Sequence, residues 1–217
     1  MQRREVYINE DFKIITLITG ALKQNCFIIK HLNSSEIILI DPGDDEDSIL
    51  KIIKEEGNLL KHVYLTHAHY DHVGAVKKIV DHYNIPYYIH SADLKLLKRA
   101  SLYSISMENR DIPFSDNYQF YDTEMILWVD KRIEIIPVPG HTPGSVAIKI
   151  DDLIFSGDLI LMNSDDITKL PGYNVDQSKK SIEFLVQNVQ EDSIFFLGHG
   201  KNAKFSVITN HISKLNK

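Results

Sequence analysis

A short run of histidine and aspartate residues is the part of this sequence that can do chemistry. It reads Thr66-His67-Ala68-His69-Tyr70-Asp71-His72. Imidazole and carboxylate groups are ligands that zinc takes, and iron and manganese also accept them. His67 and His69 are two residues apart, so in extended backbone they point the same way and can hold one metal ion together. Asp71 and His72 fall in the following turn and helix start, where they can face a second ion.

Three more candidate ligands stand far along the chain, each beside glycine and near the expected end of a strand. They are His141 in Pro139-Gly140-His141-Thr142-Pro143-Gly144, Asp158 in Ser156-Gly157-Asp158, and His199 in Gly198-His199-Gly200. Glycine lets backbone segments approach closely, and sites in α/β proteins gather at the carboxyl ends of strands. Taken singly, the two histidines would be ordinary loop residues and the aspartate a turn residue or helix N-cap. Together with the first run, they predict a complete metal centre.

The elements that must position these residues alternate between strand and helix. Runs rich in β-formers predict strands at 13–19, 25–30, 36–40, 62–66, 86–89, 132–138, 145–150, 153–155 and 193–197. Apolar residues at helical spacing predict helices at 49–56, 73–83, 92–99, 182–189 and 205–215. The first three strands form an antiparallel meander. Residues 101–130 mix proline with aromatics, so we expect a loop-rich insertion near the mouth of the site.

Length and composition suit one globular α/β domain over residues 1–217. Hydrophobic residues make up 43% and charged residues 25% of the chain, and no repeat or linker interrupts it. A formal net charge of −6 does not favour a nucleic-acid partner. The partner that we expect is a small-molecule substrate. Neither a signal peptide nor an apolar run of membrane-spanning length is evident, which favours a cytoplasmic protein without a membrane partner. Cys26, the one cysteine, is expected to be a core thiol.

The pattern HxHxDHxG, followed by PGHTPGS, FSGD and GHG, resembles the metallo-β-lactamase superfamily, and within it the glyoxalase II-like hydrolases. The resemblance runs from about residue 12 to residue 210. It implies a four-layer αββα sandwich, an α/β (α+β) fold with two divalent metal ions at one edge. Zinc is expected, with iron or manganese as alternatives. The resemblance assigns the ligands as follows: His67, His69 and His141 to the first metal, Asp71, His72 and His199 to the second, and Asp158 as a bridge between them.

The resemblance also implies how such a site would work. A metal-bound hydroxide would attack the carbonyl of a small ester, thioester or lactone, and the metals would stabilise the oxyanion. Asp71 would orient the hydroxide or carry a proton. Asp41, in Leu39-Ile40-Asp41-Pro42-Gly43, is either a turn residue or a group that bonds a ligand histidine from behind.

Three other functions stay open from the sequence. A persulfide dioxygenase with one iron would retain the same motifs. A phosphodiesterase or ribonuclease is disfavoured by the negative charge, and a non-catalytic binding protein by the complete ligand set. The segment after Asp158 also departs from the glyoxalase II pattern, because it lacks the Gly-Arg or Gly-Lys pair and contains Asp165-Asp166. About eighteen residues follow His199, so we expect no counterpart of the helical domain that helps larger glyoxalase II enzymes bind glutathione. Lys169 and Tyr173 would either face solvent or reach a substrate.

Overall fold

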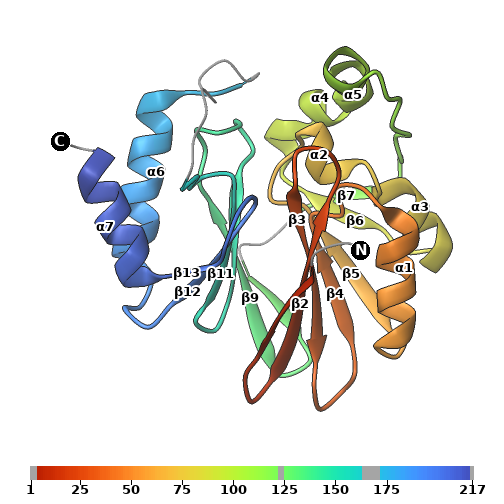
Figure 1. Ribbon diagram of the computed structural model, residues 1–217, viewed down its shortest axis with the longest axis horizontal. Coiled ribbons are helices and arrows are strands. Elements are labelled where there is room, and N and C mark those ends of the chain that lie inside the picture. The colour runs from red at the N-terminus through yellow and green to blue at the C-terminus, as the bar shows by residue number, and fades with distance from the viewer. Residues whose placement is uncertain (1–3, 122–124, 163–171, 216–217) are drawn as a thin grey trace. The chain divides into compact units, whose positions relative to one another are not determined.

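The computed structural model describes residues 4–121, 125–162 and 172–215 (Figure 1). The chain divides into two compact units, residues 1–120 and 121–217, and each unit contains one β-sheet with its own helices. The predicted mixed α/β class is therefore confirmed. Among the described residues, no helix is long and apolar enough to cross a membrane.

The sheet of the first unit has seven strands in the order β1-β2-β3-β4-β5-β6-β7. Their bounds are Arg4–Ile8, Phe12–Thr19, Gln24–His31, Ile37–Ile40, Leu60–Tyr64, Tyr87–Ile89 and Tyr118–Phe120. The first four pair antiparallel, which confirms the predicted meander, whereas β4 to β7 pair parallel. Because parallel strands end at the same edge of a sheet, residues that follow β4, β5 and β6 are brought to one edge.

Helices cross between the parallel strands of the first unit. Their bounds are Glu46–Glu55 for α1, Tyr70–Val73 for α2, Val76–Tyr83 for α3, Leu94–Leu97 for α4 and Ala100–Glu108 for α5, with a 3₁₀ turn at Ser91–Asp93. α1 buries Ile49, Ile52 and Ile53, one apolar stripe at helical spacing, and α3 does the same with its own stripe. Both stripes join one hydrophobic core with the sheet residues Ile15, Leu39 and Val63, among others.

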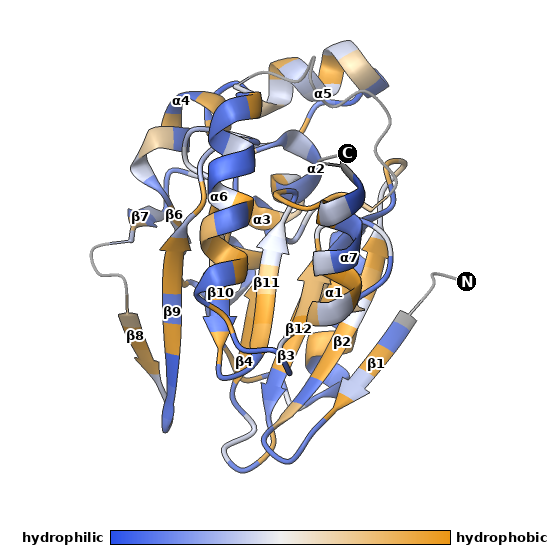
Figure 2. Cartoon of the chain, turned by 90° about the vertical axis from the view of Figure 1, so that its left-hand side faces the viewer, coloured by the Kyte–Doolittle hydropathy of each residue, from blue (hydrophilic) through white to orange (hydrophobic). Residues whose placement is uncertain are grey.

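The sheet of the second unit has six strands in the order β13-β12-β11-β10-β9-β8. The bounds are Met125–Trp128 for β8, Lys131–Pro137 for β9, Val146–Ile150 for β10, Leu153–Gly157 for β11, Ile194–Leu197 for β12 and Ala203–Lys204 for β13. The start of β11 is apolar, whereas β9 begins with charged residues and then carries isoleucines on either side of Glu134 (Figure 2). Helices α6, Val175–Gln187, and α7, Phe205–Leu215, pack on this sheet through Leu185 and Ile208. β11 and β12 are parallel, so the residues after them share an edge.

The structure corrects the prediction for residues 101–130. This region is not a loop-rich insertion, because α5 begins at Ala100 and strands β7 and β8 follow it. α5 leaves Leu102, Ile105 and Met107 exposed and buries Ala100 and Ser104. Its apolar residues therefore form no single buried stripe, so the sequence of this helix lacks the apolar periodicity that predicts a helix. The helix predicted over 73–83 is two helices, α2 and α3, and strand β1 was not predicted.

Candidate metal centre

Three histidines of the predicted site lie together directly after β5. The ring centroid of His67 is 4.8 Å from that of His69 and 4.1 Å from that of His72. All three side chains are buried, with exposed fractions of 1%, 7% and 0%. The carboxylate of Asp71 lies 3.7 Å from His72 Nε2 and keeps an exposed fraction of 12%. Four groups that can donate lone pairs are thus gathered at one strand end, as a metal site requires.

Two glycines allow the turn after β4 to lie against α2. A Cβ atom on Gly43 would stand 1.7 Å from the backbone oxygen of Asp71, and one on Gly74 would stand 2.4 Å from the oxygen of Gly43. The amide of Ala75 also donates to the carbonyl of Pro42 at 3.0 Å. This close backbone packing holds α2, and with it Asp71, at a fixed distance from the turn.

Asp41 is buried inside this turn, with a left-handed φ of 50°. Its carboxylate accepts hydrogen bonds from the Thr66 amide at 2.7 Å and the Thr66 hydroxyl at 2.6 Å, and Oδ2 lies 3.0 Å from His72 Nδ1. A carboxylate is an acceptor, so His72 Nδ1 carries the proton. The Nε2 atom of His72 is therefore left with its lone pair, which is the form that binds a metal.

The same carboxylate also sets the tautomer of His67, through Thr66. The Thr66 hydroxyl has one proton and gives it to Asp41, so it must accept at its second contact, with His67 Nδ1 at 3.0 Å. His67 then carries its proton on Nδ1 and its lone pair on Nε2. One buried carboxylate thus leaves two histidines with an Nε2 lone pair, the form in which an imidazole can bind a metal ion.

Two residues that support the backbone around the histidines and Asp41 were not predicted from the sequence. Asp93 is fully buried after β6, and its Oδ2 accepts from the amide of Ala68, between His67 and His69, at 3.0 Å. Gln24 donates to the carbonyl of Asp41 at 3.1 Å. Asp93 lies four residues after the strand predicted at 86–89, a signal that could have identified it, whereas nothing around Gln24 in the sequence marks its role.

The other three predicted ligands lie together in the second unit. Asp158, after β11, places Oδ2 3.5 Å from His141 Nε2 and 3.4 Å from His199 Nε2. His141 and Asp158 are buried, while the His199 side chain has an exposed fraction of 25%. A carboxylate oxygen between two imidazole nitrogens forms a donor set that a divalent cation can share.

The loop that carries His141 is supported by the start of α6. Gly140 has φ of 144°, and a Cβ atom there would stand 2.3 Å from the Ser178 backbone. The Ser181 hydroxyl donates to the Pro139 carbonyl at 2.6 Å, and the Asn174 amide donates to the Gly140 carbonyl at 2.7 Å. The helix therefore determines where His141 lies.

The remaining sequence predictions for the site have mixed outcomes. The ring of Tyr173 lies 6.3 Å from that of His141, nearly perpendicular to it. Lys169 and Asp165-Asp166 lie outside the described residues. Cys26 is fully buried, and its burial, together with the nearby charge of Asp41, raises the pKa of the thiol. It is therefore a core residue, as predicted, because a protonated buried thiol is neither a nucleophile nor a ready ligand.

Comparison with known proteins gives one family. Residues 19–199 match the family model described as the metallo-beta-lactamase superfamily, a stretch that contains all seven candidate ligands. The chain is 30% identical to a probable metallo-hydrolase, YqgX, of Bacillus subtilis, over 83% of this chain and 87% of the relative. It is 26% identical to the hydroxyacylglutathione hydrolase GloC of Haemophilus influenzae, over 83% of this chain and 87% of that relative.

Two solved structures are similar over nearly the whole chain. BLEG-1, a B3 metallo-beta-lactamase, aligns with a TM-score of 0.84 and 26% identity, covering 93% of this chain and 99% of its own. TTHA1623, solved in a di-iron-bound form, aligns with a TM-score of 0.81 and 28% identity, covering 90% and 97%. The predicted fold class agrees with both neighbours.

Proposed function

Because the chain belongs to the metallo-β-lactamase superfamily, we propose that it is a metal-dependent hydrolase of small thioesters, esters or lactones, similar to glyoxalase II. One observation carries the proposal: Asp41 fixes His67 and His72 in the tautomers that present Nε2 to a metal. A buried carboxylate placed behind two histidines is an arrangement that orients imidazoles toward a bound cation.

The donor atoms found in each unit are of the kinds that divalent metals bind. Imidazole nitrogens and carboxylate oxygens suit zinc, iron and manganese. We assign His67, His69 and His141 to one metal and Asp71, His72 and His199 to the other, with Asp158 bridging. Zinc is our expectation, and the di-iron form of TTHA1623 makes iron the alternative to test.

The metals would supply a water molecule acidic enough to ionise near neutral pH, and positive charge for the developing oxyanion. The protein supplies position and proton handling. Asp71 keeps part of its carboxylate exposed beside His72, so it is placed to orient the attacking water and to hold its proton. His72 cannot take this role, because both of its nitrogens are committed, one to Asp41 and one to the metal.

The choice of substrate rests on chemistry and on the relatives. A thiolate is a good leaving group, so a thioester needs little acid assistance, and GloC is named for a thioester of this kind. BLEG-1 is named as a β-lactamase, so a cyclic amide also belongs in the test. We favour the thioester because Asp158, and not a cysteine, stands between His141 and His199, unlike in those zinc β-lactamases that use a ligand cysteine.

The test combines metal analysis with activity on one sample. Protein purified without added metal is analysed for zinc, iron and manganese, then assayed with a hydroxyacyl-glutathione thioester, an aryl ester, a lactone and a cephalosporin. We expect about two divalent ions per chain and turnover of the thioester that His69→Ala abolishes. His82→Ala, at an exposed histidine on α3, is the matched control and should leave both unchanged.

Other outcomes would redirect the proposal. One iron per chain with no hydrolysis, and oxygen uptake with a persulfide, would overturn it in favour of sulfur oxidation. Turnover of the cephalosporin alone would retain the metal centre but contradict the thioester assignment. Full metal content in His69→Ala would contradict the ligand assignment itself.

A further inference from the structure

A network of polar side chains joins the end of α5 to the turn after β4 and to α2. Arg110 Nη1 lies 2.7 Å from Oδ1 of Asp44 in that turn, and Arg110 Nε lies 3.7 Å from Oε2 of Glu108, the last residue of α5. The other oxygen of Glu108 accepts a hydrogen bond from the Tyr70 hydroxyl at 3.1 Å. Because Tyr70 directly precedes Asp71, the network reaches the helix that carries two of the candidate ligands.

The turn after β4 and α2 both depend on neighbouring contacts for their conformation. α2 is a single helical turn, Tyr70–Val73, and no side-chain hydrogen bond caps its start, so it has little stability of its own. The turn contains two left-handed residues, Asp41 with φ of 50° and Asp45 with φ of 58°, a conformation that is disfavoured in residues other than glycine. Contacts from outside these segments therefore decide how firmly the candidate ligands are held.

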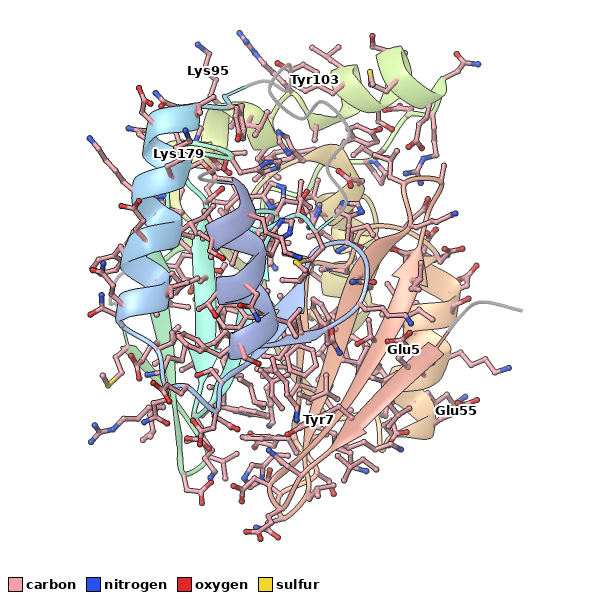
Figure 3. All side chains as sticks on the ribbon, turned by 60° about the vertical axis from the view of Figure 1, so that its left-hand side comes forward. Glu5, Tyr7, Glu55, Lys95, Tyr103 and Lys179 are labelled. Atoms are coloured by element: carbon pink, nitrogen blue, oxygen red, sulfur yellow. The ribbon has the colours of Figure 1, made fainter. Side chains whose placement is uncertain are left out.

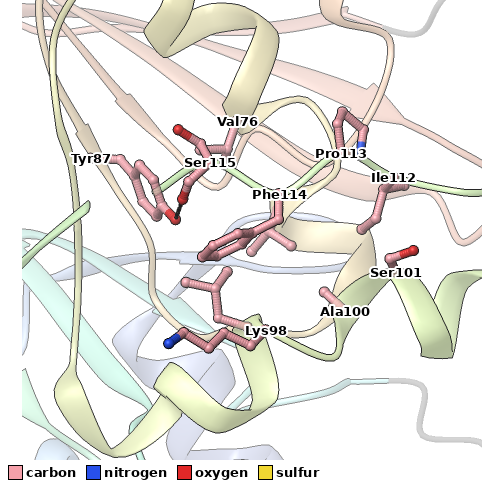
Figure 4. Close-up of a pocket in the computed structure, with 11 residues that line it drawn as sticks. Val76, Tyr87, Lys98, Ala100, Ser101, Ile112, Pro113, Phe114 and Ser115 are labelled. Carbon is pink, nitrogen blue, oxygen red and sulfur yellow. Dashed lines mark hydrogen bonds between the residues drawn. The ribbon is translucent and has the colours of Figure 1, made fainter. Parts of the chain in front are cut away.

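α5 gives this network a fixed base. Tyr103, labelled in Figure 3, is partly buried and packs against the hydrophobic core of the first unit. The Ser101 hydroxyl donates to the carboxylate of Asp111, which joins the start of the helix to the residue after Arg110. The segment 112–115 then lines a small pocket together with the start of α5 (Figure 4). The chain is therefore anchored on both sides of Arg110.

Arg110 also lies between carboxylates that would otherwise repel one another. The turn continues into an unbroken acidic run, Asp44-Asp45-Glu46-Asp47, and Glu108 adds a negative charge from α5. The side chains of Arg110, Asp44 and Glu108 are all partly buried, so water screens their charges less than at an open surface. A planar guanidinium has several donors and can contact two carboxylates at once. Without it, Asp44 and Glu108 would repel each other across the space that the guanidinium now occupies.

We propose that Arg110 is a positioning residue for the candidate metal centre. Its contact with Asp44 holds the turn that contains Asp41. Its contact with Glu108 directs that carboxylate onto Tyr70 and so holds α2. The inference rests on the proposed assignment of the α2 residues as metal ligands, and hydrogen exchange in metal-free protein tests the network separately from that assignment.

The first experiment compares amide hydrogen exchange in metal-free wild type and in Arg110→Gln. Two amides report on the held segments: that of Ala75, which donates to the Pro42 carbonyl at 3.0 Å, and that of His72, which donates to the His69 carbonyl at 3.0 Å. We expect both to exchange about fivefold faster in the variant, the upper range for a partly exposed ion pair. Amides in β2 and β3 should keep their rates, because the opening is local.

The second experiment titrates cobalt(II) into the same metal-free samples and follows its visible absorbance, which depends on ligand geometry. We expect the step assigned to Asp71 and His72 to weaken about threefold to tenfold in Arg110→Gln, less than for loss of a group that bonds a ligand directly, and the spectrum to change. Charge alone predicts the opposite sign, because removing a nearby positive charge strengthens the binding of a cation. Weaker binding therefore reports position and not charge.

Matched variants locate the effect. Lys78→Gln removes another cation of the first unit that contacts two carboxylates, Asp47 at 2.7 Å and Glu46 at 3.4 Å, and should change neither measurement. Arg110→Lys retains the charge and can contact two carboxylates through one ammonium group, as Lys78 does, so it should recover part of the loss. Tyr70→Phe removes only the hydroxyl. Because it acts through the same network, the double variant with Arg110→Gln should lose less than the sum of the two single losses.

Several results would overturn the proposal. Faster exchange throughout the first unit with unchanged cobalt binding would mean that Arg110 contributes only to stability. Stronger cobalt binding in Arg110→Gln would mean that its charge, and not its contacts, affects the site. Losses that add fully in the double variant would mean that Tyr70 and Arg110 act independently. Neither measurement uses a substrate, so failure of the proposed hydrolase activity and failure of this inference are observed separately.

Discussion

The carboxylate of Asp41 lies 3.0 Å from Nδ1 of His72, and both side chains are completely buried. This contact joins the end of β4 to α2 and places a negative charge behind an imidazole that is assigned to a metal. Because both groups are buried, neither has water as an alternative partner, and loss of the contact would leave a buried polar group without a hydrogen bond.

Asp41→Asn should weaken metal binding. The amide keeps one acceptor oxygen and replaces the other with a donor, so Thr66 or His72 loses its acceptor and the His72 tautomer is no longer fixed. Mutation of a residue that hydrogen-bonds a ligand histidine typically lowers metal affinity by about 10- to 100-fold. Competition with a chromophoric chelator measures the change, and Asp116→Asn, at an exposed aspartate, is the control. Unchanged affinity in Asp41→Asn would contradict the role given to this contact.

Asp93 should behave as a support for the two histidines on either side of Ala68. Asp93→Ala leaves the buried Ala68 amide without its acceptor, which costs about 1–3 kcal/mol of unfolding free energy and lets His67 and His69 move. Asp93→Asn retains an acceptor oxygen and should recover most of that loss. Urea unfolding and zinc affinity, measured on both variants, check the prediction. If the two variants were equally impaired, the negative charge and not the hydrogen bond would be the important property.

The residues in contiguous motifs could be predicted from the sequence. Asp158 directly follows β11 and His199 lies two residues after β12, and these strands were found because both contain short apolar runs. Parallel pairing of β11 with β12 brings Asp158 and His199 to one edge of the second sheet, and parallel pairing of β4 with β5 brings Asp41 to the histidines of the first.

The supporting residues could not be found in the same way. Gln24 bonds the carbonyl of Asp41, so its partner is a backbone atom that carries no signature in the sequence. Asp93 likewise recognises a backbone amide, that of Ala68. α5 was missed because Leu102 and Met107 face solvent, so burial does not impose a periodic pattern on the helix.

Gly43→Ala should be strongly destabilising. The new Cβ atom would stand 1.7 Å from the Asp71 backbone oxygen, and backbone cannot rotate away as a side chain can. We expect a loss of about 3 kcal/mol or more, the upper end of overpacking costs. Gly57→Ala is the control, because a Cβ atom at this position would meet nothing within 4 Å. The backbone of Gly57 has a φ of +117°, so backbone strain alone should cost about 1–2 kcal/mol. Similar losses in the two variants, measured by urea unfolding, would contradict the close packing of the turn on α2.

His62 should make the stability of the metal-free protein depend on pH. Its ring stacks 5.7 Å from that of Tyr64, and burial lowers the pKa of His62; Lys61 acts in the same direction and Glu36 opposes it. The folded state therefore disfavours the protonated imidazole, and the unfolded chain binds more protons below its ordinary pKa of about 6.5. The unfolding free energy should fall as pH drops from about 6.5 through the lower pKa of the folded state.

His62→Gln removes this titration, so its unfolding free energy should fall less steeply than that of the wild type between about pH 7.5 and about pH 5. Urea unfolding in the presence of a chelator measures both slopes without interference from metal release. The same substitution at His82, exposed on α3, controls for loss of a histidine as such. The difference between variant and wild type isolates His62 from the other histidines, provided that distant sites contribute additively. A His62→Gln slope equal to that of the wild type would show that burial of this ring does not affect its protonation.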